Sequence, residues 1–564
     1  MQALRNFLSR DFLDRLPETR RPLPWLALLC LLLWLPGFFS IPAGDRDESR
    51  FAQASRQMVE TGDLVRIRFG EVERNKKPAG IHWLQAGSVR VVEALRLGDR
   101  NDIWAYRIPS LAGALLAVLA TAQLGRALVG RRAAFLGAAM LAGCFVLGVE
   151  THIAKTDAAL LGTIVVAMGL MGRAYVHPNG FGAGAAASFW LVLGVSILLK
   201  GPIGPLVAGL AALTLAMADR AWTAGAPWLR VLRPGWGVPL MVLAAAPWFI
   251  AVTIATEGRF LTEALGGDML GKVGGADENH WGPPGYYLLS FGIAAFPAAF
   301  LVLRAAPGVW ADRLQPGTRF LLAWAVPAWL MFEAVTTKLP HYVLPTYPAL
   351  MLLAAAWALD PLRQAPPRWL ALLATVGAIA TATGLGLAAA VLPVLADGAV
   401  DPLSLLGLPA AAIFAWGLLR MLREGAPARA ALLAVLLAVP LQAVALGLVL
   451  PRLEAPWISP RLAEAVRQAA PGLPDERFGV VGYHEPSLLF ALGGEIRLLR
   501  DGAAAAEFLA GEPGRLVAVA DRQQAPFRAE AAARALAVTE RGTVSGFNYS
   551  RGRRVAITLY GTDR

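Results

Sequence analysis

Apolar residues occur along this chain in long runs that are separated by shorter polar segments. Most runs have about 20 residues, enough to cross the roughly 30 Å hydrocarbon core of a bilayer as a helix. We count about 13 such runs and expect each to span a membrane. They occupy residues 23–41, 104–124, 133–149, 158–176, 181–199, 203–218, 237–255, 286–303, 320–335, 343–359, 369–395, 403–422 and 428–450. The pattern predicts an all-α polytopic membrane protein.

Basic residues mark every second connection between these runs. With a cytoplasmic amino terminus, the positive-inside rule places these connections in the cytoplasm. They contain Arg126, Arg131 and Arg132, then Arg173, then Arg220, Arg230 and Arg233, then Arg304, Arg313 and Arg319, then Arg363 and Arg368, and finally Arg420, Arg423 and Arg429. No small-x-small cleavage site follows the first run, so we expect an uncleaved first span. An odd number of spans leaves the carboxyl end outside.

Two regions do not follow the pattern of short connections. The first external loop, residues 42–103, is long enough to escape the positive-inside rule and carries many acids. After residue 451 no span-length apolar run remains. Short apolar stretches at 478–481, 496–499, 516–520 and 555–559 alternate there with Ala-rich segments at 503–509 and 529–536. We therefore predict a membrane region over 1–451 and a soluble α/β domain over 452–564.

The composition narrows the class of protein further. The chain is 56% hydrophobic and only 16% charged, which argues against a soluble enzyme. Cys30 and Cys144 both lie in apolar runs, so neither a disulfide framework nor a thiol-rich metal site is expected. The net charge of +12 has to be considered together with its distribution across the bilayer, and nucleic-acid binding is not expected. The lipid bilayer is the first predicted partner.

Polar motifs gather on the external side of the predicted topology. They lie at residues 45–50, 75–78 with His82, 152–157, 200–202, 277–281 and 337–342. Lys155, Lys200 and Lys338 lie in very short connections, at the level of lipid phosphates. Contact with bulk anionic lipid is an equal alternative for Lys155. For Lys200 and Lys338, each followed within two residues by proline, we favour a fixed phosphate contact.

The first external loop contains two predicted amphipathic helices, at residues 47–59 and 81–95. We expect both to lie along the membrane surface. Asp47 starts the first helix and can point back towards the membrane, whereas Glu48 is also explained as a first-turn acid. Arg50, one turn later, is placed to hold the Asp47 carboxylate or a phosphate.

At these residues the chain resembles the GT-C superfamily of polyprenyl-phosphate-sugar glycosyltransferases. Within it, the chain is most similar to bacterial aminoarabinose transferases that modify lipid A, which are related to protein O-mannosyltransferases. The motifs that carry the resemblance are residues 47–52 with Gly62-Asp63, Lys77-Pro78 with Trp83, Thr156-Asp157, Lys200-Gly201, and 338–342. The resemblance implies a GT-C fold, a catalytic Asp47 with a second acid at Asp157, and carrier-phosphate contacts by Lys77, Lys338 and Tyr342. It further implies a bacterial inner membrane with the carboxyl-terminal domain in the periplasm.

The chain departs from that family at Lys76, where aminoarabinose transferases carry an acidic residue implicated in a metal site. A cation at this position argues against the same divalent site. His280 and Glu278, with His82, are the remaining candidate metal ligands, and no cofactor is assigned. Contacts of Glu48, His82 and His341 with sugar or acceptor complete the predicted site.

These residues favour transfer of a sugar from a polyprenyl-phosphate carrier to lipid A or a related envelope glycolipid. Fixed cations stabilise the leaving phosphate, and Asp47 acts as a base towards a hydroxyl acceptor or positions a phosphate acceptor. The alternative enzyme is a protein O-glycosyltransferase. A lipid or solute transporter predicts charges near the middle of spans, whereas Glu333 lies close to the external end of its run. A noncatalytic scaffold leaves the clustering of motifs on one side unexplained.

Overall fold

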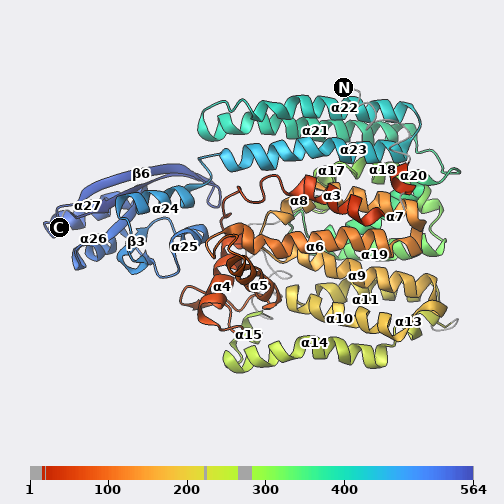
Figure 1. Ribbon diagram of the computed structural model, residues 1–564, viewed down its shortest axis with the longest axis horizontal. Helices are drawn as coiled ribbons and strands as arrows, with labels where there is room; N and C mark the ends of the chain where they lie inside the picture. Colours follow the sequence, from red (N-terminus) through yellow and green to blue (C-terminus); the bar gives the residue numbers. More distant parts are fainter. Residues whose placement is uncertain (1–14, 19–20, 221–224, 265–281, 563–564) are drawn as a thin grey trace.

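The structure is a computed structural model that describes residues 15–18, 21–220, 225–264 and 282–562. Long helices form a bundle, and a small α/β unit caps one end of it (Figure 1). Seven described helices are each long and apolar enough to cross a membrane, and one bent pair makes an eighth candidate. The chain is a multi-pass membrane protein with the predicted helical class of fold.

Each of the thirteen predicted runs contains a helix. The helices are α3 (Pro22–Trp34), α6 (Ile103–Leu124), α7 (Arg126–Gly143) with α8 (Phe145–Thr151), α9 (Asp157–Val176), α10 (Ala183–Lys200), α11 (Ile203–Ala218), α14 (Pro234–Ala255), α17 (Tyr286–Ala294) with α18 (Ala299–Ala311), α19 (Pro316–Ala334), α20 (Tyr347–Leu359), α21 (Arg368–Asp397), α22 (Gly407–Arg423) and α23 (Pro427–Gln442).

Three of these runs are interrupted in ways that hydropathy does not reveal. The first helix ends at Trp34 instead of residue 41, and Pro36 follows two residues later without the backbone N–H that the next helical hydrogen bond requires. The run at 133–149 bends by 62° between α7 and α8. The run at 286–303 is divided into α17 and α18. Because α7 and α8 share one predicted run, and α17 and α18 share another, these two breaks do not change the number of apolar runs.

Small residues bring the central helices into close contact. A Cβ atom added at Gly113 of α6 would lie 2.4 Å from the Ala159 Cα of α9, and one at Gly162 would lie 2.6 Å from the Gly113 carbonyl oxygen. Glycine at these positions lets the two backbones approach closely, as is common between membrane helices. This contact fixes the start of α9, where Asp157 lies.

The first loop forms the predicted pair of amphipathic helices, α4 (Asp47–Thr61) and α5 (Gly80–Ala94). Between them lies a short antiparallel hairpin of β1 (Arg68–Phe69) and β2 (Val72–Glu73). Phe51, Ala54 and Met58 of α4 are buried, as their helical spacing predicts. The loop lies between the bundle and the α/β unit (Figure 1).

The α/β unit, here the C-terminal domain, begins with α24 (Ile458–Ala469). Its other elements are β3 (Phe478–Val481), α25 (Pro486–Leu492), β4 (Arg497–Leu499), α26 (Gly502–Gly511), β5 (Leu516–Ala520), α27 (Gln524–Ala533), β6 (Thr539–Asn548) and β7 (Arg553–Gly561). The strand order is β4-β3-β5-β7-β6, with β3 parallel to β4 and β5, and β7 antiparallel to β5 and β6.

The sheet of the C-terminal domain has a hydrophobic core on each face. Residues of α24 and α25 pack on one face, and residues of α26 and α27 pack on the other. The four predicted apolar stretches all contain strands. Strand β6 was not predicted, because most of its side chains are exposed and polar, so it lacks an apolar run.

Candidate active site

A cavity of about 1350 Å³ lies where the helix bundle, the first loop and the C-terminal domain meet. The three parts come from widely separated stretches of sequence. Its charged lining residues are Asp45, Arg46, Asp47, Glu48, Arg50, Glu71, Glu73, Arg74, Lys76, Lys77, Lys155, Asp157, Lys200, Glu485, Glu495, Arg497 and Arg551. Most of the predicted site residues therefore surround a single space.

The membrane side of this cavity carries a compact charged cluster, defined here as Glu150, Lys155, Asp157, Lys200 and His341. Lys200 Nζ forms a very short contact with Asp157 Oδ1. Lys155 Nζ lies 2.9 Å from Glu150 Oε1 and 3.7 Å from Asp157 Oδ2. The two lysines thus share two carboxylates, and all five side chains are largely buried.

Helix termini explain why this cluster forms. Asp157 is the first residue of α9, where the helix dipole favours an acid, and Lys200 is the last residue of α10, where it favours a base. Gly201 follows with a φ of +66°, a left-handed conformation that glycine adopts easily, and turns the chain back into the membrane. The two helix ends bring the opposite charges together.

His341 and Tyr342 complete the cluster from the segment between α19 and α20. The His341 ring lies 3.4 Å from Glu150 and 3.7 Å from Asp157. Burial, reinforced by the charges of Lys155 and Lys200, lowers the pKa of His341 to about 3, so this side chain is neutral at physiological pH. Lys200 Nζ lies 5.3 Å from the centre of the Tyr342 ring.

The first loop lines another wall of the cavity. Asp47, the first residue of α4, has a side chain that is 61% exposed, and Arg74 Nη2 lies 4.0 Å from Asp47 Oδ1. Arg50, Lys76 and Lys77 also line the space. An accessible carboxylate therefore faces the same cavity as the cations that the sequence analysis assigned to a phosphate.

Three predicted site residues are placed differently. Lys338 does not line the cavity; its Nζ donates to the carbonyl oxygens of Val335 at 2.9 Å and Gly282 at 3.2 Å. His82 is fully buried between α4 and α5, where its Nδ1 lies 2.8 Å from Ser55 Oγ, and burial lowers its pKa to about 3. Glu48 borders the cavity, but Arg107 holds both of its carboxylate oxygens.

The predicted metal ligands find no counterpart in the part of the chain that the structure describes. Within those residues, no group of three or more histidine, cysteine, aspartate or glutamate side chains is arranged to hold an ion. His280 and Glu278 lie outside the described residues. Lys76 lines the cavity and brings a cation to the position where the resemblance expects an acidic ligand. The prediction that Lys76 argues against the divalent site of the family stays untested.

Asp45 is a feature of the site that the sequence analysis did not single out. Ser487 Oγ of the C-terminal domain donates to its carboxylate, and the Asp45 backbone N–H donates to Tyr549 Oη at 2.5 Å. Burial raises the pKa of Asp45 to about 6, against the opposing effect of the Ser487 hydrogen bond. Nothing local in the sequence indicates these partners, because they lie in the last fifth of the chain.

The raised pKa of Asp45 predicts a pH-dependent attachment of the C-terminal domain. An acid whose folded pKa is raised contributes stability that is complete below its unfolded value of 3.8 and is lost as the pH rises through about 6. We expect Asp45→Asn to stabilise the protein by about 1–2 kcal/mol at pH 7.5 and to have little effect at pH 4. Thermal unfolding at both pH values measures this. The exposed Glu464→Gln serves as control, and an equal effect of Asp45→Asn at both pH values would contradict the prediction.

Comparisons with known proteins agree with this arrangement. Residues 76–250 match the model of the dolichyl-phosphate-mannose-protein mannosyltransferase family. The crystal structure of ArnT from Cupriavidus metallidurans bound to undecaprenyl phosphate superposes with a TM-score of 0.73 at 22% identity, covering 95% of this chain and 98% of that one. The Archaeoglobus fulgidus oligosaccharyltransferase superposes with a TM-score of 0.50 at 13% identity, covering 87% and 64%. The chain has the GT-C fold of membrane glycosyltransferases.

Sequence relatives narrow the similarity to one group. An undecaprenyl phosphate-α-4-amino-4-deoxy-L-arabinose arabinosyl transferase of Aeromonas salmonicida is 30% identical over 356 residues, 61% of this chain and 61% of that protein. Its counterpart in Pseudomonas paraeruginosa is 28% identical over 341 residues, 59% and 57%. The chain therefore matches about three fifths of the length of these curated relatives. It is similar to the aminoarabinose transferases within the GT-C superfamily.

Proposed function

We propose that this protein transfers a sugar from a polyprenyl-phosphate carrier to lipid A or a related cell-envelope glycolipid. We take 4-amino-4-deoxy-L-arabinose as the sugar, because the relatives are named for it. The observation that carries the proposal is the single cavity that holds both the accessible Asp47 carboxylate and the Lys200 cluster at the end of the membrane helices. Such a space suits a lipid whose phosphate lies at the membrane surface.

The charged cluster would help to stabilise the leaving phosphate group. The acceptor oxygen attacks the anomeric carbon, and the bond from that carbon to the phosphate oxygen breaks with its electron pair, releasing the polyprenyl phosphate. Negative charge grows on the phosphate, so fixed donors at Lys200, Lys77, Arg50 and Tyr342 stabilise the transition state more than the substrate. Because the cluster already balances two lysines with two carboxylates, an incoming phosphate competes with Asp157 for Lys200.

Asp47 would act on the acceptor side. If the acceptor is a hydroxyl, its proton passes to the Asp47 carboxylate as the new bond forms. If the acceptor is a phosphate, it is already ionised near neutral pH, and Asp47 orients the sugar or acceptor instead. The cavity is larger than typical single-ligand pockets of 300–1,000 Å³ and has room for both partners.

We further propose that the cavity opens on the periplasmic side of a bacterial inner membrane, with the amino terminus in the cytoplasm. The support is the basic set of connections, which lies at the end of the bundle opposite the C-terminal domain. Arg319, for example, pairs with Asp219 between the end of α11 and the start of α19. In this orientation the donor and acceptor lipids approach from the same leaflet.

Reconstitution in liposomes tests the function. The protein is supplied with undecaprenyl-phosphate-linked aminoarabinose and offered lipid A and a serine-rich peptide as acceptors. We expect mass spectrometry to find lipid A heavier by one aminopentose and free undecaprenyl phosphate. Asp47→Asn is the inactive control, and Glu60→Gln, on the same helix but outside the cavity, is the matched active one. Transfer to the peptide alone would favour protein glycosylation, and transfer to neither acceptor would contradict the proposal.

A further inference from the structure

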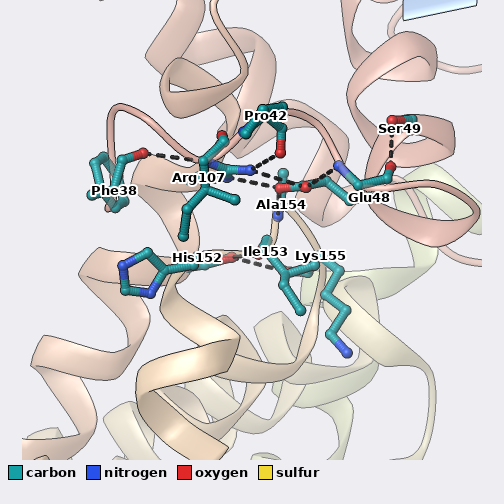
Figure 2. Close-up of polar contacts among 12 residues, drawn as sticks. Phe38, Pro42, Glu48, Ser49, Arg107, His152, Ile153, Ala154 and Lys155 are labelled. Carbon is teal, nitrogen blue, oxygen red and sulfur yellow. Dashed lines mark hydrogen bonds and ion pairs between the residues drawn. The ribbon is translucent and has the colours of Figure 1, made fainter. Parts of the chain in front are cut away.

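The Glu48 carboxylate is the centre of a buried network that joins two segments of the active site (Figure 2). Its Oε1 accepts from Arg107 Nε at 2.8 Å and from the Ala154 backbone N–H at 2.9 Å. Its Oε2 accepts from Arg107 Nη2 at 3.0 Å and from the Gly44 backbone N–H at 2.8 Å. Four donors from three separate segments therefore meet at one carboxylate.

Arg107, in the second turn of α6, is held equally firmly. Its Nη1 donates to the carbonyl oxygens of Ile41 at 2.7 Å and Phe38 at 3.2 Å, and its Nη2 donates to that of Pro42 at 3.0 Å. The segment before α4 wraps around the guanidinium group (Figure 2). The side chain of Arg107 is 0% exposed and that of Glu48 is 5% exposed. Removing either charge would leave the other one buried and unpaired.

The two segments joined by Glu48 carry the proposed chemistry. Asp47 directly precedes Glu48, and Lys155 directly follows Ala154, with Asp157 two residues later. A second hydrogen bond reinforces the connection. Ser110, which lies three residues after Arg107 on α6, donates from its Oγ to the carbonyl oxygen of Ile153 at 2.8 Å. The segment that carries Asp47 and the segment that carries Lys155 and Asp157 are therefore both hydrogen-bonded to α6, through Arg107 and Ser110.

We infer that Glu48 and Arg107 are positioning residues that couple the Asp47 segment to the Lys155–Asp157 segment, so that the two halves of the active site order together. Their role is to set the distance between the two groups without touching substrate. The predicted contact of Glu48 with sugar or acceptor does not fit this geometry, because both of its oxygens are occupied. The catalytic part of the inference rests on the proposed function, whereas the coupling of the two segments does not.

Hydrogen–deuterium exchange tests the coupling without any turnover. In Glu48→Gln, we expect exchange to rise at least tenfold in peptides covering both 38–48 and 150–157, because Gly44 and Ala154 lose a charged acceptor together. Peptides from β6 should keep the wild-type rate, and Glu60→Gln, elsewhere on α4, should change neither segment. A rise in only one segment, or in neither, would overturn the coupling.

Kinetics separate positioning from simple folding. Glu48→Gln should lower kcat for sugar transfer by about 100-fold with the donor KM within threefold, since a misplacement of about 1 Å costs that much. The double variant Glu48→Gln/Arg107→Gln leaves no buried charge unpaired and should regain part of the melting temperature that Glu48→Gln loses. Low kcat in this more stable double variant supports positioning, whereas recovery of kcat together with stability would overturn it. Absence of transfer by the wild type would instead reject the proposed function and leave the exchange result standing.

Discussion

Replacing Asp47 by asparagine is expected to lower kcat by about 10²–10⁴-fold while undecaprenyl phosphate still binds. A positioned acid or base contributes about this much to a proton transfer. The lower end applies if the acceptor is an already ionised phosphate. The Asp47 side chain is 61% exposed and lies 4.0 Å from Arg74 Nη2, so the substitution neither opens a cavity nor leaves a closely paired buried charge without its partner. The melting temperature should stay at the wild-type value.

Initial rates with saturating donor, together with binding of undecaprenyl phosphate, measure this effect. Glu60→Gln is the matched control, because it removes a carboxylate from the same helix at a residue that pairs with Arg56 away from the cavity. The outcome that would contradict the prediction is a kcat of Asp47→Asn within threefold of wild type. Equal losses of binding and rate would assign Asp47 to the carrier instead.

Replacing Lys200 by glutamine is expected to lower kcat by about 10²–10³-fold, the usual cost of removing one donor to a developing oxyanion. Lys200 lines the cavity and contacts Asp157, and it lies beside the Tyr342 ring. The Lys200 side chain is 18% exposed and that of Asp157 is 9% exposed. Because the Asp157 carboxylate is buried, loss of Lys200 leaves it more dependent on Lys155, whose Nζ lies 3.7 Å away. Donor turnover and thermal unfolding are measured together.

Two further variants separate the causes of a loss at Lys200. Lys200→Gln/Asp157→Asn removes both charges of the pair, so normal unfolding of this variant beside a destabilised Lys200→Gln would assign the destabilisation to the unpaired Asp157 carboxylate. Lys76→Gln removes an exposed lysine of the same cavity and should cost tenfold or less, because an exposed charge is screened by solvent. A larger effect at Lys76 than at Lys200 would move the phosphate site towards the first loop.

The helical class of fold could be predicted because the length of an apolar run is a local property of the sequence with a direct physical cause. A membrane helix needs about 20 apolar residues, so the thirteen runs mark helices whatever their tertiary contacts. Breaks inside runs are not visible in this way: α7 and α8 are both apolar, and no proline marks the 62° bend between them. The same reasoning fails for β6, whose partner strand β7 determines its pairing while its own side chains are mostly polar.

Much of the candidate site could also be predicted, because the side of the membrane is encoded in the connections. Asp47, Lys77, Asp157, Lys200 and Tyr342 were expected to share one side, and they line one cavity. The direction of a side chain is not encoded locally. Lys338 turns to two backbone carbonyls and His82 turns to Ser55, and neither partner is apparent from the sequence.

Arg107 could have been recognised from the sequence as a candidate functional residue. It is a lone cation four residues into an otherwise apolar run, where an ionisable side chain is costly and is a functional candidate by default. Its partner Glu48 lies 59 residues earlier, in another segment. Only the three-dimensional structure connects the two.

The hydrogen bond between Ser487 and Asp45 joins residues that are 442 positions apart. At about 5–20 residues per second, a ribosome needs roughly 20–90 s to make the intervening chain. For that interval the nascent protein has its first loop in place but lacks the wall that the C-terminal domain supplies. The cavity is therefore closed only late in biosynthesis, so a chain truncated before Ser487 would insert into the membrane with this cavity open to water.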